Sequence, residues 1–500
     1  MARMFRRHGS YPRDIIPPSS TYHASGRFGR LFGNLPPFAS DTPQIRKALL
    51  EIGMPDGIMD AGDQLAAGPV NLITDPALNL NNVNNPKMTA GMTFLGQFID
   101  HDITFDPTSS LERQVDPEMI ANFRTPTLAL DNVYGAGPAA SPHLFDQEEG
   151  QGIKFLIEET GTPNRFDLPR NTQNTALIGD PRNDENLIVS QLHLGMLKFH
   201  NNVCDFVVSE FGVTELDQVF AEAQRIVRWH YQWILLHEFL PLTCGESVVE
   251  DILKNGRRFY VWRNEPFIPV EFSVAAYRFG HSQIRPSYRT NFTGATGGGQ
   301  LFQFIFKHDA NQNSPEEDDL SGSARKPWRF IDWRTFFNFG DALVRPNKKI
   351  DPLLSTPLFA LPPTVVPNPN PVSNPISLAQ RNLLRHLTFS LPSGQRVAKA
   401  MQLTPLSDGD FDDLKQHGLE NRTPLWFYIL REAQILEKGE RLGPVGGRIV
   451  AEVFIGLIQG DDKSFLSQEP DWKPFLPTID VSVHGEDFTM VDLLRFAGVA

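Results

Sequence analysis

Prolines and glycines interrupt this chain along its whole length, and their distribution limits what it can fold into. The sequence contains 40 Pro and 38 Gly among 500 residues, and alternating apolar and polar runs of strand length are hard to find between them. Proline ends or kinks a helix and is confined to the edges of sheets. The sequence therefore predicts a mostly α-helical protein with long irregular loops and little β-structure.

Apolar residues recur at helical spacing in several segments. The clearest of these segments are 89–104, 186–211, 215–240, 271–281, 376–387 and 444–458. We expect Gly212 to close the second segment, Thr214 to cap the third, and Pro241 with Gly245 to stop it. This pattern favours an antiparallel helical hairpin.

The composition changes along the chain suggest one large domain preceded by an arm. Residues 1–80, rich in Pro, Gly and Asn, predict an extended arm with one short helix at 43–52, and residues 81–500 predict the domain. The segments 307–326, with four successive acids at 316–319, and 351–375, with eight prolines, cannot be regular elements. Because helical patterns lie on both sides, we expect surface loops there and not linkers.

Charge and cysteine content exclude several classes of protein. With 46 basic and 59 acidic residues, the net charge is −13, whereas a general binder of nucleic acid or anionic membranes needs a cationic face. Cys204 and Cys244 are the only cysteines, so neither a disulfide framework nor a cysteine-rich zinc site is available.

No membrane span or secretory signal is evident in the sequence. No apolar run approaches the roughly 18 residues that a span requires. Asp14 and Pro17 stand where a signal peptide would have its apolar stretch. We therefore expect a cytoplasmic location by default, with export by another route left open.

The densest polar cluster in the sequence is the segment 96–102. In a helix, Gln97 and His101 are four residues apart and share one face, while Asp100 and Asp102 flank His101. Such a cluster could bind a metal, act as an acid/base site, or form a solvated polar turn.

Three further clusters have ordinary interpretations when each is considered alone. Segment 179–185 suits capping of the helix that follows, because acids are favoured at a helix N-terminus. Segment 275–286 places His281 at a helix end, where a lone histidine is more often structural. Segment 378–385 places Asn382 and Arg385 on one helical face.

Together and in this order, the four clusters resemble the animal-type haem peroxidase family, part of the peroxidase–cyclooxygenase superfamily. The matching motifs are Gly-Gln-x-x-Asp-His-Asp at 96–102, Gly-Asp-x-Arg-x-x-Glu at 179–185, Arg-x-Gly-His at 278–281 and Leu-x-x-x-Asn-x-x-Arg at 378–385. Weaker matches lie at 132–135, 197–201 and 391–394. The resemblance runs from about residue 80 to about residue 460, and it implies the helical fold of that family.

The resemblance implies haem b as the cofactor and gives roles to individual residues. His281 would be the ligand of the haem iron, with Asn382 bonded to its other ring nitrogen. On the opposite face His101 would take a proton from hydrogen peroxide and return it to the leaving oxygen. Arg182 would stabilise the charge that develops, and Gln97 would hold a water or a halide.

Four more charged residues occupy positions at which the family contacts its haem. Arg278 and Arg385 would pair with the haem propionates. Asp100 and Glu185 lie where family members form ester bonds to the haem. The residue after Glu185 is Asn186 and not the Met of the best-known halide-oxidising member, so a sulfonium link is not expected.

The resemblance also implies a calcium ion. Asp102 matches a calcium ligand of the family, and Thr125 fits the partner loop. The loop's usual Asp is Ala129 here, and its Ser position holds Asp131. Asp131 would supply the negative charge that Ala129 lacks, and we therefore expect calcium to be bound by Asp102, Thr125 and Asp131.

The residue three positions before His281 favours a peroxidase over an oxygenase. The fatty-acid oxygenases of the superfamily have a radical-forming tyrosine there, whereas this chain has Arg278, and Tyr277 is one position off. The sequence predicts a peroxidase that reduces hydrogen peroxide and oxidises a small phenolic, aromatic or halide donor. The alternatives are a fatty-acid dioxygenase that uses Tyr277 and a non-catalytic haem-binding module. The number of subunits is left open.

Overall fold

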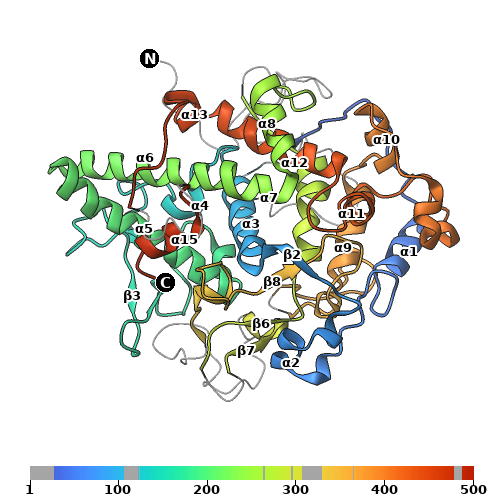
Figure 1. Ribbon diagram of the computed structural model, residues 1–500, viewed down its shortest axis with the longest axis horizontal. Coiled ribbons are helices and arrows are strands. Elements are labelled where there is room, and N and C mark those ends of the chain that lie inside the picture. The colour runs from blue at the N-terminus through green and yellow to red at the C-terminus, as the bar shows by residue number, and fades with distance from the viewer. Residues whose placement is uncertain are drawn as a thin grey trace.

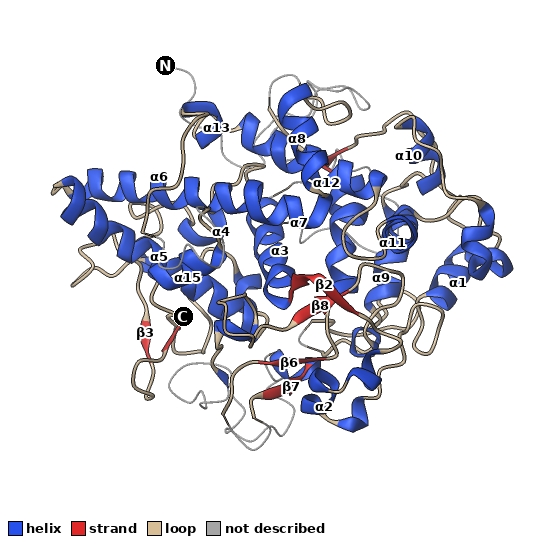
Figure 2. Cartoon of the chain, in the orientation of Figure 1, coloured by secondary structure: helices blue, strands red, loops and turns tan. Residues whose placement is uncertain are grey.

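The computed structural model describes residues 28–105, 122, 124–262, 265–293, 297–306, 329–363, 365–477 and 487–500. In these ranges helices cross one another at the centre of the molecule and long irregular segments join them (Figure 1). Figure 2 shows that strands are few and short. The predicted mostly helical class is confirmed. The predicted irregular segment 307–326 lies outside the described residues, as do residues 1–27 of the predicted arm.

Helix α3, Ala90–Ile103, lies in the middle of the molecule and matches the predicted segment 89–104. Apolar side chains bury it on several sides, with Phe94, Phe98 and Ile99 at most 1% exposed. Gly91 is required at its start, because a Cβ there would lie 2.5 Å from the Phe337 ring. Its position in the core makes α3 a rigid support for the polar residues near its C-terminal end.

Helices α5, Leu187–Phe211, and α6, Leu216–Ile234, form the predicted hairpin (Figure 1). Gly212 ends α5 in the left-handed conformation, with φ of 67°, as expected. The prediction for Thr214 is wrong, because Glu215 occupies the N-cap position of α6 and no side chain caps it.

Pro241 does not stop the helical path that α6 begins, contrary to the prediction. The path widens into a π-turn at Leu235–Phe239 and continues as α7, Leu240–Cys244. Pro241 falls in the first turn of α7, where a missing N–H costs little. Gly245, with φ of 93°, then ends the path.

The predicted helix at 271–281 is helical but of a different type. A π-turn, Glu271–Ala275, is followed by a 3₁₀-helix, Ala276–Gln283, which runs past His281. Side chains bond the carbonyls of this segment: Ser273 Oγ donates to the Pro269 oxygen at 3.2 Å, and Arg278 Nε donates to the Ser273 oxygen at 2.8 Å.

The other predicted helices are confirmed as α1, Pro43–Ile52, α9, Leu378–Thr388, and α12, Pro444–Gly460. The remaining α-helices are α2, Pro69–Thr74; α4, Asp131–Tyr134; α8, Glu246–Asn255; α10, Gly394–Ala400; α11, Leu425–Leu436; α13, Phe465–Gln468; and α15, Met490–Phe496. Among the described residues the strands form four pairs: β1, Phe28–Gly29, with β5, Ile268–Pro269; β2, Asn84–Thr89, with β8, Pro346–Lys348; β3, Glu158–Glu159, with β4, Phe166–Asp167; and β6, Ser287–Arg289, with β7, Gly299–Leu301.

Residues 28–80 of the predicted arm contact the rest of the chain at several points. Strand β1 pairs with β5 in parallel, and α1 packs against α9. The Glu271 carboxylate accepts the backbone N–H groups of Leu31 and Phe32 at 2.9 and 3.1 Å. That residues 81–500 form the domain by themselves stays a prediction.

Cys204 and Cys244 are both buried and free. Among the described residues, no helix combines the length and the apolar character needed to cross a bilayer.

Candidate functional site

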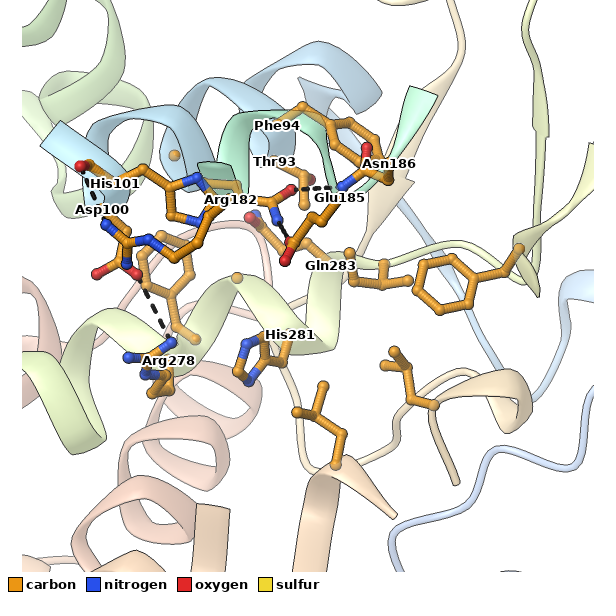
Figure 3. A pocket seen from close by; sticks show the side chains of 18 of the residues that line it. Thr93, Phe94, Asp100, His101, Arg182, Glu185, Asn186, Arg278, His281 and Gln283 are labelled. Atoms are coloured by element: carbon orange, nitrogen blue, oxygen red, sulfur yellow. Dashed lines mark hydrogen bonds and ion pairs between the residues drawn. The ribbon is translucent and has the colours of Figure 1, made fainter. Parts of the chain in front are cut away.

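A cavity of about 300 Å³ lies between α3 and the 3₁₀-helix 276–283. One wall comes from α3 and the residues that follow the 3₁₀-turn Pro181–Asp184, and the facing wall carries His281 (Figure 3). One end of the cavity is apolar and is lined by Ile284, Phe302, Ile305, Phe306, Leu358, Leu361, Val365 and Leu378. The volume is at the lower end of the usual range for small-molecule sites, about 300–1,000 Å³.

His101 projects from α3 toward this cavity and is 5% exposed. Its Nδ1 lies 2.8 Å from Oδ1 of Asn183. Burial, and next the charge of Arg182, lower the pKa of His101 to about 4. The ring is therefore neutral near pH 7 and can accept a proton.

Arg182 is held beside His101 by a buried carboxylate. Its Nε and one terminal nitrogen donate to the two oxygens of Asp180 at 3.1 and 2.8 Å, and that nitrogen also donates to the His101 backbone oxygen at 3.1 Å. Arg124 pairs with Asp180 as well. Burial opposes ionisation of Asp180, but the two arginines outweigh it and lower its pKa to about 2. A fixed positive charge thus lies at the cavity wall.

Gln97 is already bonded within the cavity wall. Its Nε2 donates to the Glu185 carboxylate, and its Oε1 accepts from Asn186 Nδ2 at 3.3 Å (Figure 3). Burial raises the pKa of Glu185 to about 7. Asn186 also caps α5, because its Oδ1 accepts the N–H groups of Ile188 and Val189. The predicted contact of Gln97 with a water or a halide stays a prediction.

His281 lies on the opposite wall, with its ring bonded to α9. Its Nδ1 is 2.7 Å from Nδ2 of Asn382. Burial, and next the charge of Arg278, lower the pKa of His281 to about 3, so the ring stays neutral. Asn382 is tied to the core, since its backbone oxygen bonds His386 Nδ1 at 2.9 Å, and His386 Nε2 accepts the Trp426 N–H at 2.9 Å.

Three arginines gather at one side of the cavity. Arg278 forms an ion pair with Asp100 at 3.7 Å, and it joins Arg182 and Arg385 in lining a smaller cavity of about 100 Å³. Burial alone would raise the pKa of Asp100, but Arg278 and Arg182 leave it below its usual value. Arg278 and Arg385, the predicted propionate partners, thus line one small cavity, and Arg278 pairs with Asp100, one of the two predicted ester positions.

Asp102 is buried and is not among the residues that line the cavity. Its Oδ2 accepts the Leu130 N–H at 3.1 Å, while its Oδ1 is buried without a partner in the described structure, as is Oδ1 of Asn132. Burial, and next the charge of Asp131, raise the pKa of Asp102 to about 8. Thr125 precedes Asp131 and Asn132 in the same segment of the chain. Within the described ranges, no three His, Cys, Asp or Glu side chains form a metal-binding group.

Sequence reasoning assigned no role to Asn183, His193 or Gln283. Asn183 contacts His101, His193 contacts Asn183 at 3.0 Å, and Gln283 lines the cavity. Asn183 and Gln283 lie beside motif residues in the sequence, and that proximity is the one signal that could have drawn attention to them.

The fold and the site define a helical protein whose cavity has two neutral histidines on opposite walls, with Arg182 and Arg278 also in its lining. Residues 109–320 match the family model described as "Animal haem peroxidase". Over this range the chain is similar to the members of that family.

Two curated relatives illustrate the similarity. Peroxidasin of Drosophila melanogaster is 26% identical over 377 residues, which are 68% of this chain and 23% of that protein. Human thyroid peroxidase is 26% identical over 192 residues, which are 35% of this chain and 20% of that protein. The matched regions thus span less than a quarter of the length of either relative.

Solved structures support the fold. Peroxidase A from Dictyostelium discoideum has a TM-score of 0.55 at 15% identity, over 90% of this chain and 92% of that chain. The fatty acid alpha-dioxygenase of Oryza sativa has a TM-score of 0.54 at 14% identity, over 83% of this chain and 73% of that chain. At these identities the likeness concerns the fold alone.

Proposed function

We propose that the protein is a haem-dependent peroxidase. It would reduce hydrogen peroxide to water and oxidise a small phenolic, aromatic or halide donor. The observation that carries the proposal is the convergence of His101, Arg182 and His281 on one cavity. With a one-electron donor, one H₂O₂ and two donor molecules would give two waters and two donor radicals.

The residues around the cavity fit a haem. His281 is neutral, and Asn382 holds its Nδ1 at 2.7 Å. Iron binding by His281 Nε2 requires the Asn382 amide to present its oxygen to Nδ1, so that the ring proton lies on Nδ1 and Nε2 keeps its lone pair. Arg278 and Arg385 supply positive charge for two carboxylates. When bound, the haem supplies an iron that reacts with peroxide and passes the oxidising equivalents to the donor.

His101 and Arg182 would carry the proton and charge steps. The neutral His101 accepts the proton of the first peroxide oxygen and delivers it to the second, which leaves as water. Arg182 stabilises the negative charge that develops while the O–O bond breaks. Asp180 keeps the guanidinium in place, so this stabilisation needs no rearrangement during the reaction.

The environment of Tyr277 disfavours the dioxygenase alternative. Its hydroxyl donates to the Gly96 backbone oxygen at 3.0 Å, and its ring stacks on Phe272 with centroids 4.9 Å apart. Arg278, and not a tyrosine, stands three residues before His281. The likeness to the rice dioxygenase concerns the fold and carries no activity to this chain.

We further propose that Asp100 and Glu185 attach the haem covalently through ester bonds. Both carboxyl groups line the cavity, on the wall opposite His281. After turnover with peroxide, the haem should stay with the protein through extraction with acidic organic solvent. Asp100→Asn and Glu185→Gln should each weaken this retention, and full extraction of the wild-type haem would contradict the link.

We also propose that a calcium ion binds near Asp102. The buried Oδ1 of Asp102 lacks a partner, and Asp131 lies close enough to raise the pKa of Asp102. A hard divalent cation bound by oxygen ligands would satisfy both carboxylates. Thr125 would supply a further oxygen ligand.

An absorption spectrum of protein expressed with ample haem tests the main proposal. We expect a Soret band that shifts with one equivalent of hydrogen peroxide and returns when a phenolic donor is added. A haem band indifferent to peroxide would favour a non-catalytic module. Absence of haem would overturn the proposal.

A further inference from the structure

A chain of three buried side chains leads from the cavity into the core. His101 Nδ1 lies 2.8 Å from Oδ1 of Asn183, and Asn183 Nδ2 lies 3.0 Å from Nδ1 of His193. Asn183 and His193 are fully buried, and His193 on α5 does not line the cavity. Its ring packs edge-on against Phe98 of α3, with centroids 6.1 Å apart.

The orientation of the Asn183 amide determines which nitrogen of His101 carries the proton. An amide oxygen only accepts, so a neutral His101 bonded to Oδ1 carries its proton on Nδ1. Nε2 then keeps its lone pair and can act as a base. If the amide presented its nitrogen instead, the proton would lie on Nε2 and this base would be lost.

His193 gives the amide its second bond. In the observed orientation Nδ2 donates to His193 Nδ1, so both ends of the amide are satisfied inside the core. This arrangement puts the proton of the neutral His193 ring on Nε2, which has no partner among the described residues. Without an acceptor at this position, the amide would bury an unpaired N–H in the observed orientation, and the reversed orientation would compete.

We propose that Asn183 is a positioning residue that holds His101 as a base with its proton on Nδ1, and that His193, as a neutral ring with its proton on Nε2, holds the Asn183 amide in the required orientation. This inference rests on the proposed function, because it concerns the proton step at His101. Neither residue is a motif position, since the family pattern leaves position 183 open and does not reach position 193.

Cyanide binding to the ferric haem protein tests the base without turnover. Hydrogen cyanide gives up its proton when it binds the iron, so the stopped-flow rate of the Soret change depends on the base. We expect Asn183→Ala to lower both this rate and the rate of the first reaction with peroxide by about 10²-fold. Haem content and melting temperature serve as checks on folding.

The conservative variant Asn183→Asp should restore both rates to near the wild-type values, because a carboxylate oxygen accepts from Nδ1–H. Wild-type rates in Asn183→Ala would overturn the role of Asn183. A failure of rescue by Asn183→Asp in a folded, haem-loaded protein would overturn the tautomer argument.

A double-mutant comparison tests His193. His193→Phe alone should lower the cyanide rate, but by less than Asn183→Ala does. In the Asn183→Asp background the same change should have no effect, because a carboxylate presents an acceptor in either orientation. An equal effect in both backgrounds would show that His193 does not act through the amide.

A measurement on the unaltered protein keeps the inference falsifiable if a variant fails to fold. The measurement is a ¹⁵N NMR spectrum of the diamagnetic ferrous carbonyl form labelled with ¹⁵N-histidine. The His101 signal is identified by its loss in His101→Gln, and it should show the proton on Nδ1. A proton on Nε2 would overturn the inference. Failure to bind haem would instead overturn the proposed function.

Discussion

Two neighbouring residues of α3 face regions of opposite character. His101 faces the cavity, where the charged groups have partners: Arg182 pairs with Asp180, and Arg278 pairs with Asp100. Asp102 faces a closed region in which one of its own oxygens has no partner in the described structure. The helix thus separates a site arranged for proton transfer from a site in which burial, and next the charge of Asp131, raise the pKa of a carboxyl group.

The difference indicates what each region requires. The cavity holds a fixed positive charge beside two neutral rings, an arrangement suited to a reaction in which charge develops. We expect the region around Asp102 to gain stability from a bound cation, because burying an unpaired carboxylate is costly. Variants on one side of α3 should therefore leave the properties of the other side unchanged: variants at the cavity should keep calcium-dependent stability, and variants at Asp102 should keep the reaction with peroxide.

The largest effect is expected for His281→Ala. Removal of the ligand should lower haem affinity by more than the roughly 10–100-fold that loss of a ligand's hydrogen-bond partner costs. Haem absorbance per mole of protein measures the change, with the exposed His143→Ala as control. Calcium-dependent stabilisation should persist in the variant. Unchanged haem content would show that another residue binds the iron.

A smaller effect is expected for Arg182→Ala. Haem should stay bound, but the first reaction with peroxide should slow by about 10²-fold, as for loss of one charge-stabilising donor. Stopped-flow absorbance gives the rate. Arg334→Ala, at a half-exposed arginine that pairs with Asp332, is the matched control. A wild-type rate would exclude Arg182 from the proton and charge steps.

Asp102→Asn tests the other side of α3. Calcium at 100 times its dissociation constant should stabilise the wild type by about 2.7 kcal/mol, and this gain should be absent in the variant. Thermal melts with and without calcium measure it, and Asp205→Asn at an exposed surface pair serves as control. Peroxide reactivity of the variant should stay near wild type. Equal stabilisation of both proteins would place the calcium elsewhere.

The sequence predicted the residues of the cavity better than their partners. Helical spacing places Gln97 and His101 on one face of α3, and both line the cavity. The bonds that hold these residues join distant segments, as between His101 and Asn183, and a local pattern carries no information about them. The proximity of Asp131 to Asp102 was predicted from the family resemblance, because the two residues are far apart in the sequence and no helical spacing joins them.

Local rules failed where tertiary contacts override them. The segment around His281 forms a π-turn and a 3₁₀-helix, although its apolar spacing predicted an ordinary helix, and Arg278 bonds the Ser273 carbonyl within it. Pro241 was expected to end a helix, but a π-turn places it in the first turn of the next one. Neither outcome follows from propensity alone.

The smallest effect is expected for Tyr277→Phe, which tests the link between the two walls of the cavity. Loss of the hydroxyl leaves the Gly96 carbonyl without this donor and should cost about 1–2 kcal/mol of folding stability. The peroxide reaction should stay near wild type, because Tyr277 takes no part in the proposed proton steps. Urea melts and stopped-flow rates measure the two quantities. If the wild type consumed oxygen with a long-chain fatty acid and the variant did not, the dioxygenase alternative would replace the peroxidase.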